Sequence, residues 1–99
     1  MEREGRLSSF LNEVNKTTLQ KAFGSLIRRR RNEAGLTQEK LADEAGIHRT
    51  YISLLERGQR AATIEVLRRL AKGLKTTMTV LIAELEGVEL PPEFKGKKP

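Results

Sequence analysis

Residues 38–55 read QEKLADEAGIHRTYISLL and decide the fold. The stretch places a small residue at Ala42, a glycine at Gly46 and a branched apolar residue at Ile52. Two crossed helices need a small side chain where they touch, a turn residue that tolerates positive φ, and an apolar plug beneath the second helix. The spacing therefore predicts two short helices, over residues 38–45 and 49–57, joined by a tight turn.

Three further helices are predicted around this pair. Apolar residues recur at three- and four-residue spacing over residues 19–34 and 64–72, and again after Thr77. Gly35 suits a left-handed helix C-cap, while Thr37 and Thr63 are good N-caps. We expect an all-α fold, a compact five-helix domain over residues 19–86.

The two ends of the chain differ from this domain. Residues 1–18 form an N-terminal arm that carries an apolar pattern typical of a short amphipathic helix: Leu7, Phe10, Leu11 and Val14. Residues 87–99 contain Pro91, Pro92 and three lysines, which is typical of a mobile tail. The predicted organisation is thus an arm, a domain and a flexible tail.

The charge of the chain favours an acidic partner. Its 99 residues include 19 Lys and Arg against 13 Asp and Glu, a formal charge of +6. The excess lies within residues 1–76, which include the helix pair, whereas residues 77–99 are slightly acidic. Positive charge on such a module is typical of nucleic-acid binding.

Composition argues against several other classes of protein. There is no cysteine and His48 is the single histidine, so we expect no disulfide, no metal site and no cofactor. No nucleophile–base pair or phosphate-binding glycine loop is visible, which argues against an enzyme. No window approaches the length of a membrane span, and the N-terminus lacks the apolar core of a signal peptide. We expect a soluble, cytoplasmic, nucleoid-associated protein.

The second helix of the pair has a face that is free to read bases. With Ile52 set at zero on a helical wheel, Thr50, Ser53 and Leu54 lie at about 160°, 100° and 200°. Arg49 lies on the flank but in the first turn, which is the part of such a helix pushed deepest into the major groove. An arginine there can donate two bonds to guanine. The base-reading candidates are therefore Arg49, Thr50, Ser53 and Leu54; the alternative is an exposed helix face without a partner.

Other polar side chains near the pair are candidates for contacts with the DNA backbone: Gln38, His48, Tyr51, Arg57, Gln59 and Arg60. Gln38 starts a helix, where it can either bind a phosphate or brace the second helix. His48 is a weak cap or a phosphate contact, and Tyr51 either reaches a phosphate or only packs. Gln59 and Arg60 are otherwise ordinary loop residues.

Two charged residues are predicted to form a structural ion pair. Glu56 lies about 40° from Ile52 on the wheel, close to the buried face, where an unpaired carboxylate is costly. The four arginines at residues 28–31 cannot all face one side of a helix, so one of them turns inward. We expect a partly buried pair between Arg31 and Glu56.

Apolar residues of the last helix exceed what a small core needs, and these are candidates for a dimer interface: Met78, Leu81, Ile82 and Leu85. Two domains related by a two-fold axis place their second helices about 34 Å apart, one turn of B-DNA. Phe10 and Leu11 of the arm are possible additions to this interface. The alternative is that all four residues pack within one monomer.

At this point the segments LTQEKLADEAGI, RTYISLLERG and IEVLRRLAKGL resemble the lambda-repressor-like, XRE/Cro-type helix-turn-helix domain. RTYIS within a short single domain is also similar to the controller proteins of restriction-modification systems. The resemblance covers about two-thirds of the chain and implies a five-helix domain that binds operator DNA as a dimer.

The resemblance also carries expectations for individual residues. In the family, the position of Gln38 touches DNA, those of Arg49, Thr50 and Ser53 read bases, and those of Arg31 and Glu56 form a salt bridge. The chain departs from the common pattern at three places: His48, residues 61–62 (Ala-Ala where Asn-Pro is frequent), and Arg30. The loop is therefore expected to be less rigid.

The sequence thus predicts a transcriptional regulator that binds a palindromic operator in double-stranded DNA as a homodimer, either a restriction-modification controller or a phage-type repressor. The alternative is an antitoxin or co-regulator that also holds a protein partner through the arm or tail. A basic amphipathic membrane binder shares the charge but does not need the spacing of Ala42, Gly46 and Ile52.

Overall fold

The computed structural model describes residues 2–95, with side chains from Thr18 to Phe94. All regular structure within this range is helical. In chain order the helices are α1 (Glu2–Glu33), α2 (Gln38–Ala45), α3 (Arg49–Glu56), α4 (Ile64–Gly73), α5 (Met78–Glu86) and α6 (Pro92–Lys95). The described residues include no helix with the length and apolar character needed to cross a bilayer.

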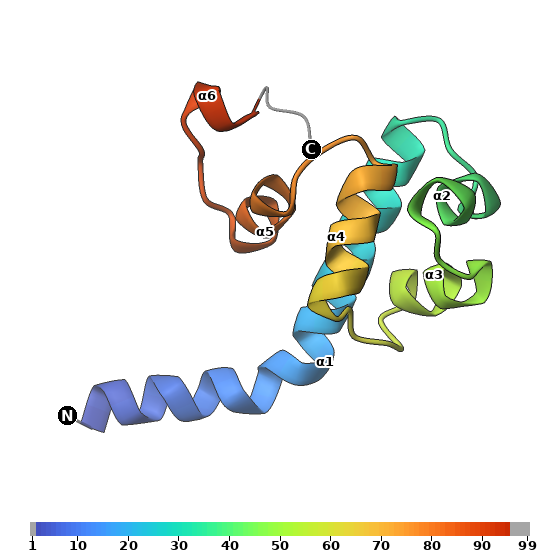
Figure 1. The fold of residues 1–99 in the computed structure, drawn as a ribbon. Helices are drawn as coiled ribbons and strands as arrows, with labels where there is room; N and C mark the ends of the chain where they lie inside the picture. Colours follow the sequence, from blue (N-terminus) through green and yellow to red (C-terminus); the bar gives the residue numbers. More distant parts are fainter. Residues whose placement is uncertain (1, 96–99) are drawn as a thin grey trace.

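Helix α1 is longer than the sequence pattern suggested. We expected a domain helix to start near Leu19, but α1 runs without a break from Glu2 to Glu33, and its first part projects away from the other helices (Figure 1). No glycine or proline lies between residues 6 and 23 to interrupt it. The predicted amphipathic pattern of the arm and its possible part in a dimer interface concern Leu7, Phe10, Leu11 and Val14. These residues lie outside the range whose side chains the structure describes.

The core is built by five of the helices. Helix α4 packs against α2 on one side and α5 on the other, while α1 packs against α3 and α5 (Figure 1). The largest fully buried side chains come from α1 to α5 in turn: Ile27, Leu41, Ile52, Leu55, Leu70 and Leu81. The predicted five-helix all-α domain is thus confirmed.

The helix ends follow the predicted caps. Thr37 Oγ1 accepts a hydrogen bond from the Lys40 amide at 3.0 Å, and Thr63 Oγ1 accepts one from the Val66 amide at 3.1 Å. Gly46 has φ 68°, the left-handed conformation that the tight turn between α2 and α3 requires. These caps satisfy amides that have no partner within a helix.

Two glycines let helices approach more closely than other residues allow. A Cβ atom on Gly24 of α1 would lie 2.2 Å from the Leu55 carbonyl oxygen of α3. A Cβ atom on Gly73 of α4 would lie 3.1 Å from the Ala45 Cβ atom of α2. Backbone-to-backbone contact therefore fixes α3 against α1, and α2 packs directly on α4.

The segment after Gly87 contains more structure than a mobile tail suggests. Its backbone forms the short helix α6 over Pro92–Lys95, and Leu90 is half-buried. Pro92 stands at the first position of α6, where its fixed φ suits a helix start.

Candidate nucleic-acid interface

The first turn of α3 faces solvent. Arg49 and Thr50 are exposed, and Ser53 and Leu54 are half-buried one turn further along. On the opposite side of the same helix, Ile52 has no exposed surface. The structure therefore brings the four predicted base-reading residues together on the free face of α3.

The other end of α3 is anchored by the predicted ion pair. Arg31 donates to Glu56 through Nε at 2.6 Å and through Nη2 at 3.0 Å, which makes a two-point contact. The side chains of Arg31 and Glu56 are only 11% and 2% exposed. The prediction of a partly buried Arg31–Glu56 pair is confirmed.

Two further hydrogen bonds complete this anchor. Arg31 Nη1 donates to the Leu36 carbonyl oxygen at 2.8 Å, and Gln38 Nε2 donates to Glu56 Oε1 at 3.0 Å. The hydrogen bonds to Glu56 raise the pKa of Arg31 above its ordinary value. Gln38 thus braces α3, which is one of the two roles expected for it.

His48 caps α3. Its Nδ1 atom accepts a hydrogen bond from the Thr50 amide at 3.2 Å, and its φ and ψ angles of −65° and 138° are those of an N-cap residue. The residue is otherwise exposed. The expected capping role of His48 is confirmed.

The loop after α3 is tied back to the helix by Tyr51. Its hydroxyl group donates to the Ala61 carbonyl oxygen at 2.7 Å, and its ring packs against the core. Arg57, Gln59 and Arg60 are exposed beside this loop. The contact gives the Ala-Ala loop a restraint that the sequence did not indicate.

An arginine on α4 contacts the turn between α2 and α3. Arg69 Nη1 donates to the Gly46 carbonyl oxygen at 3.0 Å, and Arg69 Nε donates to Glu65 Oε2 at 2.9 Å. Sequence reasoning missed this contact because the residues lie 23 positions apart. A second missed contact joins α1 to α5, where Arg30 pairs with Glu84.

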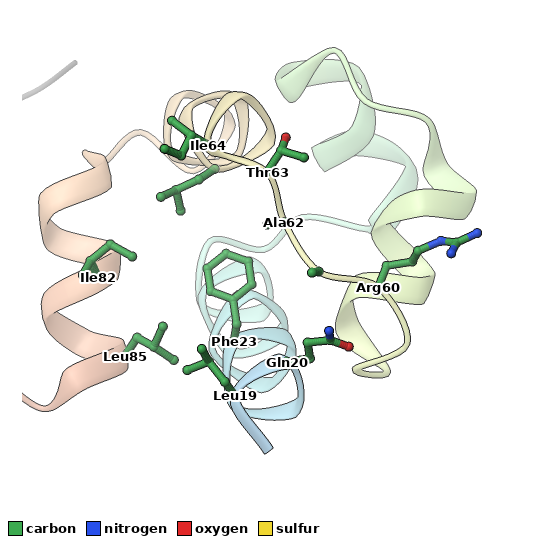
Figure 2. A pocket seen from close by; sticks show the side chains of 11 residues that line it. Leu19, Gln20, Phe23, Arg60, Ala62, Thr63, Ile64, Ile82 and Leu85 are labelled. Atoms are coloured by element: carbon green, nitrogen blue, oxygen red, sulfur yellow. The ribbon is translucent and has the colours of Figure 1, made fainter. Parts of the chain in front are cut away.

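Helix α5 and its neighbours enclose an apolar hollow of about 280 Å³. In Figure 2 the side chains of Ile82 and Leu85 point from α5 toward Leu19 and Phe23 of α1, and Ile64 stands at the start of α4. Leu19 is 50% exposed and Ile64 is 76% exposed, and neither residue was among the predicted interface residues.

One of the four residues predicted for a dimer interface must be corrected. Leu81 has no exposed surface because its side chain fills the core, so it cannot contact a partner. Met78 and Leu85 are half-buried, and Ile82 is 36% exposed. The prediction failed at Leu81 because hydrophobicity alone does not show which apolar side chains of α5 pack into the core.

Within the part of the chain whose side chains are described, acidic and histidine side chains do not gather into a metal site. Among the described residues, no three or more His, Cys, Asp or Glu side chains lie close enough to hold an ion. The carboxylates of Glu56, Glu65 and Glu84 each pair with arginines instead.

Comparison with known proteins agrees with this geometry. The helix-turn-helix family matches residues 27–81, more than half of the chain. The chain is 45% identical over 56 residues to the control protein C.SmaI of Serratia marcescens, covering 57% of this chain and 67% of that protein. It is 42% identical over 53 residues to the control protein C.BamHI of Bacillus amyloliquefaciens, covering 52% of this chain and 65% of that protein. The chain thus spans about two-thirds of these relatives.

A solved structure shares the fold. The restriction-modification controller protein C.Esp1396I, a tetramer in complex with its natural 35 base-pair operator, is similar with a TM-score of 0.65 and 38% identity. The match covers 70% of this chain and 91% of that chain. The chain therefore belongs to the XRE-type helix-turn-helix family of DNA-binding transcriptional regulators.

Proposed function

We propose that the protein is a restriction-modification controller that binds a palindromic operator as a homodimer. The observation that carries this proposal is the asymmetry of α3. Its first turn presents Arg49 and Thr50 to solvent, while the buried Glu56 anchors its last turn. A helix held in this way can enter the major groove with its N-terminal end first.

The proposal gives each of the predicted DNA-contact residues a role. Arg49, Thr50 and Ser53 read base edges, and the Leu54 side chain contacts a thymine methyl group. His48 and, after the other end of α3, Arg57, Gln59 and Arg60 contact phosphates that position the helix. Tyr51 packs against the core instead, because its hydroxyl proton is donated to the Ala61 carbonyl oxygen. Gln38 adds a phosphate contact at the start of α2 while it braces Glu56.

A second copy of the chain covers the apolar surface formed by Leu19, Ile64, Met78, Ile82 and Leu85. These residues lie around the hollow and on the exposed side of α5. Their partial exposure supports an interface between copies, because contiguous apolar surface of this kind is usually covered. The tetramer that C.Esp1396I forms on its operator supports association between copies of the chain.

The relatives support the controller assignment. Both control proteins are more than 40% identical to this chain over more than 50 residues, and the chain covers most of the solved controller structure. We place the protein in the cytoplasm on the chromosome, where a regulator of this type finds its operator.

Selection from a pool of random 30-base-pair duplexes tests the proposed function. Enriched sequences are expected to contain two inverted half-sites about one helical turn apart. Footprinting on the DNA upstream of the protein's own gene is expected to protect a matching site. Enrichment of no sequence over the starting pool would contradict the proposal.

Light scattering after size-exclusion chromatography tests the dimer. The wild-type protein is expected to be dimeric at micromolar concentration, and Ile82→Asp is expected to be monomeric but folded, because Ile82 is partly exposed. Phe94→Asp is a matched control, since it adds the same charge at an exposed apolar residue outside the hollow. A wild-type monomer, or dimers in both variants, would argue against this interface.

A further inference from the structure

Arg69 stands where α4 meets the turn between α2 and α3. Gly73, one helical turn later on α4, has no side chain to keep α4 away from Leu41 and Ala45 of α2. The close approach of the two helices brings the middle of α4 within reach of the turn. Arg69 extends from this part of α4 to the Gly46 carbonyl oxygen at 3.0 Å.

The guanidinium group is itself held in place. Its Nε atom donates to Glu65 Oε2 at 2.9 Å, while Nη1 donates to Gly46. The side chain therefore connects a carboxylate on α4 to a backbone carbonyl in the turn. An arginine can do this because its donors are fixed in one plane, which makes the bond directional.

Gly46 determines where α3 begins. Its amide bonds to carbonyl oxygens at the end of α2, and the next amide, that of Ile47, bonds to the Ala42 carbonyl oxygen at 3.0 Å. His48 then caps α3 directly before Arg49. A bond that fixes the Gly46 peptide plane therefore fixes the direction in which Arg49 and Thr50 are presented.

We propose that Arg69 is a positioning residue for base reading, which orients the first turn of α3 through Gly46 and does not contact DNA. This inference rests on the proposed function, because it concerns the bases that α3 reads. The alternative role for an exposed arginine at this position is a contact with a DNA phosphate. The two roles predict different binding data.

Arg68 supplies a matched control. It lies next to Arg69, carries the same charge and pairs with the same carboxylate, Glu65, at 2.6 Å. Its side chain is 59% exposed against 44% for Arg69. Among the hydrogen bonds of the described residues, Arg69 donates one to the turn and Arg68 donates none to it. Differences between Arg69→Gln and Arg68→Gln therefore report the bond to Gly46.

The test measures affinity for an enriched duplex and for a scrambled duplex of equal length, across a range of salt concentrations. Arg69→Gln is expected to lower the ratio of the two affinities about tenfold, the effect of one lost charge-assisted hydrogen bond. The salt dependence should stay that of the wild type, and Arg68→Gln should leave the ratio unchanged. Arg69→Lys keeps the positive charge but lacks the planar guanidinium group, so its affinity ratio should be as low as that of Arg69→Gln.

Amide hydrogen exchange gives a readout that needs no DNA. The Ile47 amide is expected to exchange several-fold faster in Arg69→Gln than in Arg68→Gln, because the turn opens locally. If the wild-type protein enriches no duplex, the proposed function fails while this measurement still tests the positioning role.

Three results would overturn the inference. Equal Ile47 exchange and equal affinity ratios in the two glutamine variants would show that the bond positions nothing. Equal weakening on both duplexes, with a salt slope lower by about one, would assign Arg69 to a phosphate. Full recovery of the ratio in Arg69→Lys would show that charge alone is sufficient.

Discussion

The two ends of α3 are built in opposite ways. At the C-terminal end, Leu55 and Glu56 are buried, and Glu56 accepts hydrogen bonds from two side chains. At the N-terminal end, Arg49 and Thr50 extend into solvent. The buried anchor lies at one end of the helix and the proposed base-reading residues Arg49 and Thr50 lie at the other, so substitutions at the two ends should affect different measurements.

Glu56→Ala should have the largest effect, at the anchored end. It leaves Arg31 buried without its carboxylate and removes the partner of Gln38, so the free energy of unfolding should fall by about 3–5 kcal/mol. Urea or thermal melts measure this loss. Glu65→Ala removes an exposed carboxylate that also pairs with arginines, and it should change stability little. A loss below about 1 kcal/mol for Glu56→Ala would remove the distinction between the two ends.

Gly24→Ala tests the same end through packing alone. The added methyl group would overlap the Leu55 carbonyl oxygen, so α1 or α3 must shift, and the expected loss is about 1–3 kcal/mol. Ser25→Ala, at the next and exposed residue of α1, is the control and should lie within about 0.5 kcal/mol of wild type. Equal melting temperatures for the two variants would show that α1 and α3 do not touch at Gly24.

Arg49→Ala tests the exposed end. Discrimination at one base pair of each half-site should fall by about 1–3 kcal/mol, while the melting temperature stays close to that of wild type. Arg57→Ala should instead weaken binding to every duplex and lower the salt slope by about one. Competition binding with single-base variants of the enriched duplex measures both effects. A uniform loss for Arg49→Ala would assign Arg49 to the DNA backbone.

The smallest effect is expected at Glu84, an ion pair outside α3. Arg30 lowers the pKa of Glu84, so the pair stabilises the fold fully above the ordinary glutamate pKa of about 4.3 and loses this contribution as the pH falls through the lower, folded-state pKa. Stability curves of wild type and Glu84→Gln should differ by less than about 1 kcal/mol at pH 7 and converge at acidic pH. A constant difference across this range would exclude the pair as its cause.

Local sequence pattern predicted the parts of the fold that are locally determined. The caps at Thr37 and Thr63, the turn at Gly46 and the buried Ile52 depend on neighbours within a few residues. The Arg31–Glu56 pair was predictable as well, because a carboxylate near a buried face requires a partner.

Contacts between distant segments were not predictable from the same pattern. From the sequence alone, Gly24 is only a residue of low helix propensity. The structure shows that it allows α3 to pack directly against α1. The bonds of Arg69 to Gly46 and of Arg30 to Glu84 join residues 23 and 54 positions apart, and no periodicity in the sequence encodes such pairs. The same limit explains why Leu81 was assigned to a surface that it does not reach.

The absence of a side chain at Gly24 has a consequence for adaptation on binding. Where methyl or larger groups separate two helices, small rotations are absorbed by rotamer changes, but a backbone-to-backbone contact leaves no such compliance. α3 therefore cannot rotate without carrying α1 with it. On an operator bound as proposed, a mismatch in groove width must then be accommodated by bending of the duplex and by the long arginine side chains.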